Sequence, residues 1–72
     1  MLNFYVYEGS APLGKEKLTC VRHKWDDLKT HSGAIRRAKR IYKGRPFTLY
    51  TFTNWYDDKT FKLILKGAKF PK

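Results

Sequence analysis

SGAIRRAKRIYKGR, residues 32–45, is the stretch of this 72-residue chain that decides the fold. Its apolar side chains recur at intervals of three and four residues, which places them on one face of an α-helix. They are Ala34, Ile35, Ala38, Ile41 and Tyr42. We expect a helix over residues 33–43, in which the Ser32 hydroxyl caps the first turn and Gly44 takes the left-handed conformation that ends many helices.

The opposite face of this helix is cationic. It and its C-terminal flank carry six basic residues and no acid: Arg36, Arg37, Lys39, Arg40, Lys43 and Arg45. The solvated side of an amphipathic helix usually mixes both signs of charge, so the absence of acids favours a surface that contacts phosphates. Arginine suits this role because its planar guanidinium can bind phosphate through two hydrogen bonds, and lysine adds attraction at longer range.

The composition predicts a folded basic protein with a single domain. A chain of 72 residues has room for one core, and 42% hydrophobic with 17% aromatic residues is too rich for a disordered segment. Sixteen Lys and Arg against six Asp and Glu give a formal charge of +10. This charge favours a polyanionic partner, with nucleic acid, DNA or RNA, as the first candidate. The alternative is that the charge only keeps a small protein in solution.

Cysteine usage and hydropathy bear on the cellular compartment. The single cysteine, Cys20, permits no disulfide within the chain and no thiolate metal cluster, which favours a reducing compartment. No basic segment precedes an apolar run, and no apolar stretch approaches the ~20 residues that span a bilayer. We therefore expect a cytoplasmic protein, in the host cytoplasm if the chain is viral, with no membrane partner and no cofactor.

Four other segments are predicted as strands, two before the helix and two after it. Alternation favours a strand over residues 2–7, with Leu2, Phe4 and Val6 toward the core. A Gly- and Pro-containing loop and a less regular strand over 18–25 follow, and residues 26–31 fit either a loop or an early helical turn. The remaining strands are predicted over 45–54 and 60–66. The order β-β-α-β-β predicts one α+β domain over 1–72, with one helix packed on a mainly antiparallel sheet.

A two- or four-residue turn at Asp57 and Asp58 would pair Thr53 with Lys62 and Phe52 with Leu63. This register puts five large apolar side chains on the face that we expect the helix to cover: Tyr50, Phe52, Phe61, Leu63 and Leu65. The other sheet face would stay open and present aromatic rings with lysines: Tyr5, Tyr7, Trp55, Lys62 and Lys66. Such rings can stack on unpaired bases while the lysines hold the backbone. The alternative is that the rings pack against each other or bind a protein.

The sequence offers little for catalysis. His23 and His31 lie near Asp26 and Asp27 in the chain, and a histidine with a carboxylate can perform acid–base chemistry. No nucleophile motif, phosphate-binding glycine loop or set of metal ligands accompanies them. We expect a non-enzymatic protein with no catalytic residue and no metal site. The sequence also contains none of the common motifs of DNA- and RNA-binding modules.

In size, aromatic content and absence of known motifs, the chain resembles the small accessory proteins that bacteriophages make to redirect or disable host machinery. The resemblance implies one function, inhibition of a host protein through an acidic surface on that partner. The residues themselves favour another, nucleic-acid binding through the helix, with Lys62, Lys66 and Trp55 as secondary contacts. The second function is the leading prediction.

Overall fold

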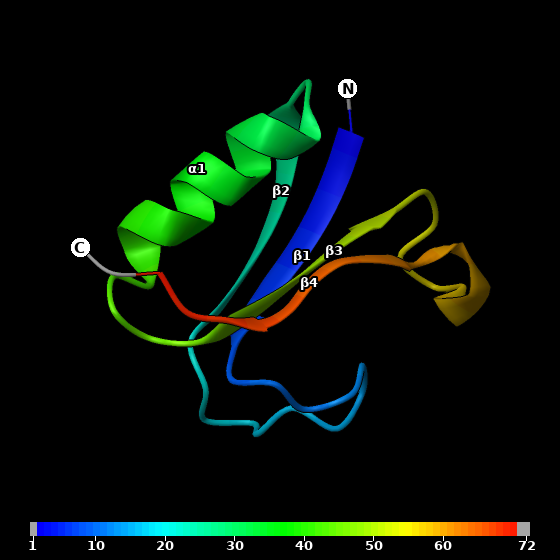
Figure 1. The fold of residues 1–72 in the computed structure, drawn as a ribbon. Coiled ribbons are helices and arrows are strands. Elements are labelled where there is room, and N and C mark those ends of the chain that lie inside the picture. Colours follow the sequence, from blue (N-terminus) through cyan, green and yellow to red (C-terminus); the bar gives the residue numbers. More distant parts are fainter. Residues whose placement is uncertain (1, 71–72) are drawn as a thin grey trace.

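A four-stranded antiparallel sheet carries one helix on one of its faces in the computed structural model, which describes residues 2–70 (Figure 1). The elements are β1 (Leu2–Glu8), β2 (Arg22–Leu28), α1 (His31–Ile41), β3 (Phe47–Phe52), the 3₁₀ turn η1 (Asp58–Thr60) and β4 (Lys62–Ala68). The strands lie in the order β2-β1-β3-β4. This confirms the predicted α+β class and the order β-β-α-β-β.

Helix α1 begins two residues earlier than predicted. Its N-cap is Thr30 rather than Ser32, since the Thr30 hydroxyl accepts a hydrogen bond of 3.0 Å from the backbone N–H of Gly33. After the helix, Gly44 has a positive φ of 69°, the left-handed conformation expected for it. Ala34 and Ala38 are buried, which confirms the predicted apolar face. No helix among residues 2–70 has the length and apolar character needed to cross a membrane.

Strand β2 begins four residues later than the strand predicted over 18–25. It takes in Asp26, Asp27 and Leu28, which the sequence left open between a loop and a helical turn. The pairing with β1 explains this, because β2 follows β1 from Arg22 opposite Tyr7 to Leu28 opposite Leu2. A long-range partner therefore fixes the strand where the local pattern is irregular.

The register of β3 and β4 also differs from the prediction. Lys62 pairs with Thr51 rather than Thr53, and Leu63 with Tyr50 rather than Phe52. The tight turn is replaced by a longer connection that contains η1, in which the Asp57 carboxylate accepts from the Lys59 N–H at 3.0 Å. The longer connection shifts the pairing by two residues, and bulges then change the register again beyond Tyr50.

The helix covers the predicted face of β1, with Phe4 and Val6 in the core, but the face of β3 opposite to the one predicted. Val6 pairs with Leu49, so both side chains share a face, and that face packs against α1. The core between helix and sheet consists of Phe4, Val6, Trp25, Ala34, Ala38, Tyr42, Phe47 and Leu49. Tyr50, Phe52 and Phe61, expected beneath the helix, lie on the other face. Leu65 does pack on the helix side, whereas Leu63 remains 51% exposed.

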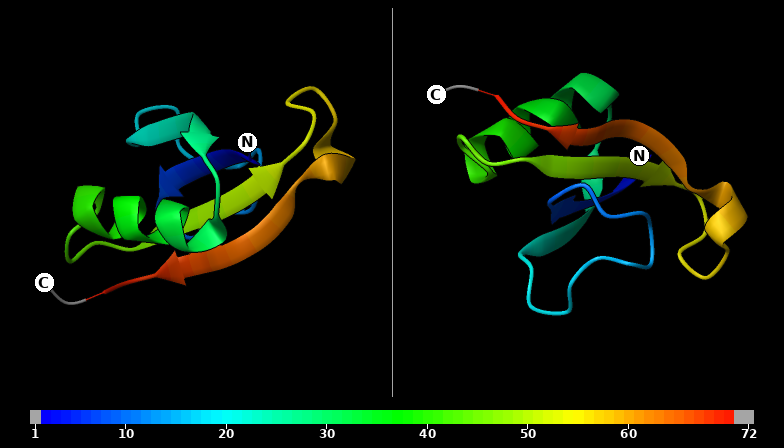
Figure 2. Two further views of the ribbon diagram at one scale, coloured as in Figure 1. Left: turned by 90° about the horizontal axis from the view of Figure 1, so that it is seen from above. Right: turned by 60° about the horizontal axis from the view of Figure 1, so that its bottom comes forward.

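The sheet face away from α1 was predicted to be open, but part of it is covered. The connection between β1 and β2 folds across it, on the side of the sheet away from α1 (Figure 2). Ala11, Leu13 and Cys20 of this connection pack on Tyr5 and Tyr7, which are 5% and 0% exposed. The two tyrosines therefore belong to a second small core and are not available for base stacking.

Candidate nucleic-acid interface

Three basic side chains lie on the outward side of α1 and in the turn that follows it. Arg36 and Arg40 are four residues apart, which aligns them along the helix opposite its buried alanines, and Lys43 follows in the turn just after the C-cap residue Tyr42. All three are exposed. Among residues 2–70, no ion pair or hydrogen bond engages these three side chains. We call these three residues the outer cationic stripe.

Arg37 differs from its neighbours because it is held by the sheet. Its guanidinium donates to both carboxylate oxygens of Asp27, at 2.9 and 3.0 Å, and lies 5.1 Å from the centre of the Trp25 ring. The hydrogen bond from Arg37 lowers the pKa of the Asp27 carboxyl. Arg37 therefore already has an anionic partner within the protein.

Arg45 is also engaged within the fold. It contacts the Glu8 carboxylate at 3.3 Å and donates to the carbonyl oxygen of Ile41 at 3.2 Å. Glu8 lies 37 positions away in the sequence, and Asp27 lies 10 positions from Arg37. The sequence between residues 36 and 45 contains no acid, so it gave no sign of these partners, which belong to strands β1 and β2.

Lys39 flanks the outer cationic stripe on the side of the C-terminal segment. Its ammonium lies 4.4 Å from the centre of the Phe70 ring, and the Phe70 ring lies 5.8 Å from that of Phe47. Lys39 stays exposed, and no acid among residues 2–70 pairs with it. It can therefore add charge to the stripe while its stem covers an aromatic ring.

The secondary contacts predicted from the sequence lie on two different elements. Lys62 and Lys66 are exposed on the edge strand β4, and Lys62 lines a shallow pocket together with His31 and Leu2. Trp55 belongs to the connection between β3 and β4. Its ring packs edge-to-face on Tyr5, at 5.1 Å between centres, on the sheet face away from α1.

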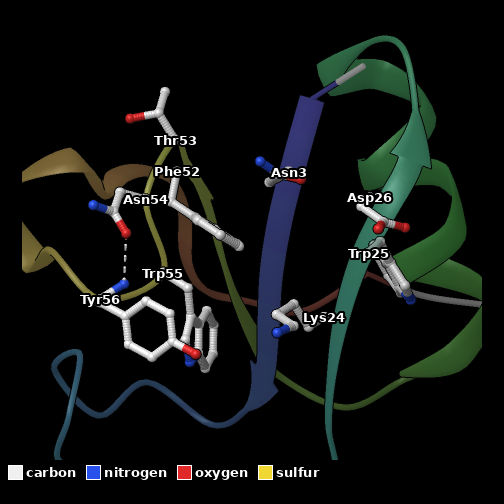
Figure 3. Close-up of a pocket in the computed structure, with 9 residues that line it drawn as sticks. All are labelled: Asn3, Lys24, Trp25, Asp26, Phe52, Thr53, Asn54, Trp55 and Tyr56. Atoms are coloured by element: carbon white, nitrogen blue, oxygen red, sulfur yellow. Dashed lines mark hydrogen bonds between the residues drawn. The ribbon is translucent and has the colours of Figure 1, made fainter.

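The cation that lies over the Trp55 ring is Lys24 of β2, with its Nζ 4.5 Å from the ring centre. Sequence reasoning did not single out Lys24 or Tyr56, which lines a pocket together with Lys24 and Trp55 and is 92% exposed (Figure 3). A signal for Lys24 was present, because it alternates with the core residue Trp25 and must face the other side of the sheet.

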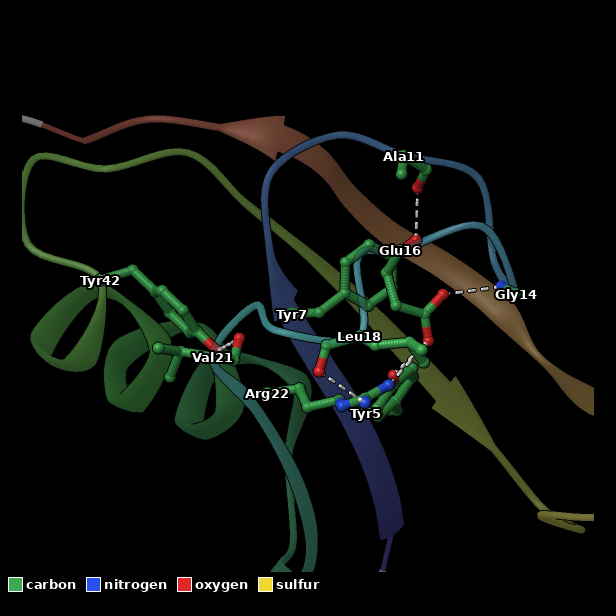
Figure 4. Close-up of polar contacts among 9 residues, drawn as sticks. All are labelled: Tyr5, Tyr7, Ala11, Gly14, Glu16, Leu18, Val21, Arg22 and Tyr42. Atoms are coloured by element: carbon green, nitrogen blue, oxygen red, sulfur yellow. Dashed lines mark hydrogen bonds and ion pairs between the residues drawn. The ribbon is translucent and has the colours of Figure 1, made fainter.

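Hydrogen bonds from tyrosine hydroxyls hold the connection between β1 and β2 against the sheet face away from α1 (Figure 4). The Tyr5 hydroxyl donates to the Glu16 carboxylate, which also accepts from the Gly14 N–H at 2.8 Å and faces Arg22 at 3.7 Å. Burial, followed by the bond to Glu16, raises the pKa of Tyr5 to about 12. Burial would by itself raise the pKa of Glu16, but the bonds from Tyr5 and the backbone lower it. These groups hold the loop in place and do not titrate near neutral pH.

The histidines and acids do not assemble into an acid–base pair. His31 packs edge-to-face on Phe4, with 5.8 Å between ring centres, and His23 stacks on Trp25 at 6.1 Å. Neither histidine is hydrogen-bonded or ion-paired to Asp26 or Asp27. Across residues 2–70, no group of three His, Cys, Asp or Glu side chains could hold a metal ion.

Two surfaces thus combine exposed groups that the core does not use. One is the outer cationic stripe on α1, and the other is Trp55 with Lys24 on the far side of the sheet. The first offers positive charge, and the second offers an aromatic ring with a cation. Comparison of the chain with protein-family models, with curated proteins and with solved structures found no match.

Proposed function

We propose that this protein binds nucleic acid, DNA or RNA, through the outer cationic stripe of α1, without catalysing a reaction. The observation that supports the proposal most directly is that Arg36, Arg40 and Lys43 are exposed and without an acidic partner among residues 2–70. At a rise of 1.5 Å per residue, Arg36 and Arg40 are roughly 6 Å apart along the axis of α1, a spacing that suits neighbouring phosphates, and Lys43 extends the stripe past the C-terminus of the helix. A cytoplasmic location, expected from the sequence, belongs to this proposal.

The distribution of ion pairs also favours a polyanion. Of the six acids, Glu8, Glu16 and Asp27 pair with Arg45, Arg22 and Arg37. These three acids are engaged with arginines outside the outer cationic stripe and do not neutralise its charge locally. Unpaired positive charge on a convex helix attracts the phosphate backbone, while the bases contribute no specificity at this surface.

The test compares two variants that lose the same charge. Arg36→Gln/Arg40→Gln removes two cations from the stripe and keeps good helix formers, and Lys15→Gln/Lys17→Gln removes two from the exposed loop before β2. Binding to labelled duplex and single-stranded oligonucleotides is measured by fluorescence anisotropy between 50 and 200 mM salt. Each phosphate contact contributes about 0.9 to the slope of log affinity against log salt on duplex DNA, and about 0.7 on single strands.

We expect the stripe variant to reduce this slope by about 1.8 on duplex DNA and to weaken binding to both polymers, because two phosphate contacts are lost. The loop variant should change the slope by less than half as much. Equal slopes for the two variants would contradict the proposal, since the charge would then act without a defined contact surface.

The alternative function, inhibition of a host protein through an acidic surface on that partner, would use the same stripe. It predicts no binding by the wild type to either polymer, even at 50 mM salt. That outcome would reject nucleic-acid binding and favour a protein partner.

A further inference from the structure

A shallow pocket lies beside Trp55, at the end of the sheet face that the β1–β2 loop leaves uncovered (Figure 3). Its volume is ≈ 320 Å³. Three strands and one connection line it, with Asn3 from β1, Lys24 and Asp26 from β2, Phe52 from β3, and Trp55 and Tyr56 from the following connection. The pocket thus combines aromatic walls with an amide, a carboxylate and an ammonium group, a mixture suited to a flat and polar ring.

The Trp55 indole is fixed in position and yet accessible. Its edge contacts are to Tyr5 at 5.1 Å and Phe52 at 5.3 Å between ring centres, and a third ring, Phe61, lies at 5.9 Å. Tyr5 and Phe52 are themselves almost fully buried, whereas Trp55 keeps 38% of its surface exposed. A ligand that stacks on this ring does not have to order it first, which lowers the cost of binding.

The connection that carries Trp55 and Tyr56 is held by its own hydrogen bonds. The Thr60 hydroxyl lies 2.9 and 2.8 Å from the carbonyl oxygens of Asn54 and Asp57, and accepts from the Asn54 N–H at 3.1 Å. The Asn54 side chain accepts from the Tyr56 N–H at 3.0 Å. These bonds fix the two aromatic residues in a local scaffold before any ligand arrives.

Lys24 supplies a positive charge directly beside the Trp55 ring. In this structure its Nζ lies 4.5 Å from the centre of the Trp55 ring. A lysine has a flexible four-carbon stem, so a flat ring that takes this place on the indole can displace the ammonium toward an adjoining phosphate. Trp55 would then stack on the base while Lys24 neutralises the adjoining phosphate.

Asp26 gives the pocket a preference among flat rings. Asp26 lines the pocket together with Lys24, whereas Asp27 faces Arg37. Asp26 is exposed and forms no ion pair within residues 2–70. A carboxylate repels phosphate but can accept two parallel hydrogen bonds, and guanine is the base whose pairing edge offers two adjacent N–H donors, on N1 and N2.

We propose that this pocket binds one unpaired guanine of a single-stranded nucleic acid, with the base stacked on Trp55 and its N1–H and N2–H donating to Asp26. The inference rests on the proposed nucleic-acid binding and adds a second surface, on the opposite side of the sheet from the stripe. A duplex cannot use this pocket, because its bases are paired and stacked. Single strands and duplexes therefore report on the two surfaces separately.

The test uses the full chain and thymidine octamers that carry one central guanine, one central hypoxanthine, or thymine only. Hypoxanthine keeps the N1–H of guanine and lacks the N2 amine. Binding is followed by anisotropy of the labelled octamer, and the quenching of tryptophan fluorescence reports stacking. We expect the wild type to bind the guanine octamer at least ~10-fold more tightly than the thymine octamer, with hypoxanthine between them.

Two variants and two controls test the named contacts. Trp55→Leu should weaken binding of the guanine octamer by roughly 5- to 150-fold, the range for loss of one stacked base, and should change duplex binding less than twofold. Trp55→Phe keeps a stacking ring and should restore most of the affinity. Asp26→Asn should abolish the preference for guanine over hypoxanthine, whereas Asp58→Asn, with the same loss of charge at an exposed carboxylate, should keep it.

Three outcomes would overturn the proposed guanine pocket. Trp55→Leu could weaken the binding of single strands and duplexes equally, or it could weaken neither. The third is a preference for guanine over hypoxanthine that survives Asp26→Asn. If any of them is seen while Arg36→Gln/Arg40→Gln still lowers the duplex salt slope, the stripe stands and the pocket alone fails. If the wild type binds no duplex but prefers the guanine octamer, the stripe fails and the pocket stands. Circular dichroism melts establish that each variant is folded before its binding is compared.

Discussion

Ala38→Asp gives the sharpest test of how α1 sits on the sheet. Ala38 is fully buried in the core between helix and sheet. In the unfolded chain the new carboxyl has a pKa of about 3.9 and is ionised at pH 7. Burial requires its neutral form, and protonating it roughly 3 pH units above this pKa costs about 4 kcal/mol. The added volume costs a further ~1–3 kcal/mol. For a chain of this length the free energy of unfolding is on the order of 4–11 kcal/mol, so we expect the variant to be largely unfolded at pH 7.

The pH dependence of this loss identifies its cause. Burial raises the folded-state pKa of the new carboxyl above its unfolded value, so its ionisation penalty is absent below about pH 4 and grows as pH rises toward the folded-state pKa. Relative to wild type, the variant should therefore regain about 4 kcal/mol between pH 7 and pH 4. Lys39→Asp is the matched control, since it adds a carboxylate one residue away at an exposed position.

Urea unfolding followed by circular dichroism at pH 4 and pH 7 measures both effects. Wild-type titrations cancel in the difference between the variants and the wild type. Equal stability of Ala38→Asp and Lys39→Asp at pH 7 would refute the reasoning, as would a loss that does not diminish in acid. If Ala38→Asp shows no folded baseline at pH 7, Ala38→Ser provides a smaller loss that can still be ranked against the control.

Two further predictions concern the second face of the sheet. Thr48 is fully buried, and its hydroxyl donates to the Gly9 carbonyl at 2.7 Å and accepts from the Gly67 N–H at 3.1 Å. Thr48→Val should lower the free energy of unfolding by ~1–3 kcal/mol, because both backbone groups lose their partner. Urea unfolding measures this loss, and an unchanged stability would contradict the prediction. The pKa of Tyr5 is raised to about 12, so its hydroxyl contributes stability below pH 10 that is lost between pH 10 and 12. The stability difference between wild type and Tyr5→Phe should therefore narrow over that range in alkaline denaturation, and a constant difference would argue against the buried hydroxyl.

The helix and its buried face could be predicted from the sequence because their information is local. Ala34, Ala38 and Tyr42 repeat at four-residue spacing, and this spacing is enough to define one side of a helix. The fold class followed from the same kind of evidence, since alternating apolar residues mark β1 and β3 without reference to a partner. The predicted start of the helix was wrong by two residues, because the prediction placed the cap at Ser32, although Thr30 is also a good capping residue and caps the helix in the structure.

The face of β1 that meets the helix was predicted correctly, but the covered face of β3 could not be predicted, because it depends on pairing between distant segments. Alternation assigns Leu49 and Tyr50 to opposite faces but does not say which face meets the helix. The pairing of Leu49 with Val6 decides this, and the two residues are far apart in the chain. The β1–β2 loop then hides Tyr5 and Tyr7, although its own sequence shows only residues that favour turns.

The same reasoning explains why the cationic residues could be listed but not sorted. In the sequence, Arg36 and Arg37 are equivalent members of one basic run. In the fold, the helix turns them apart by about 100°, so Arg37 meets Asp27 of β2 and Arg36 faces outward. An ion-paired arginine must give up its partner to bind a phosphate, whereas an unpaired one loses only water and counterions. Binding should therefore depend on Arg36, Arg40 and Lys43 more than on Arg37 and Arg45, a ranking that the linear charge pattern does not contain.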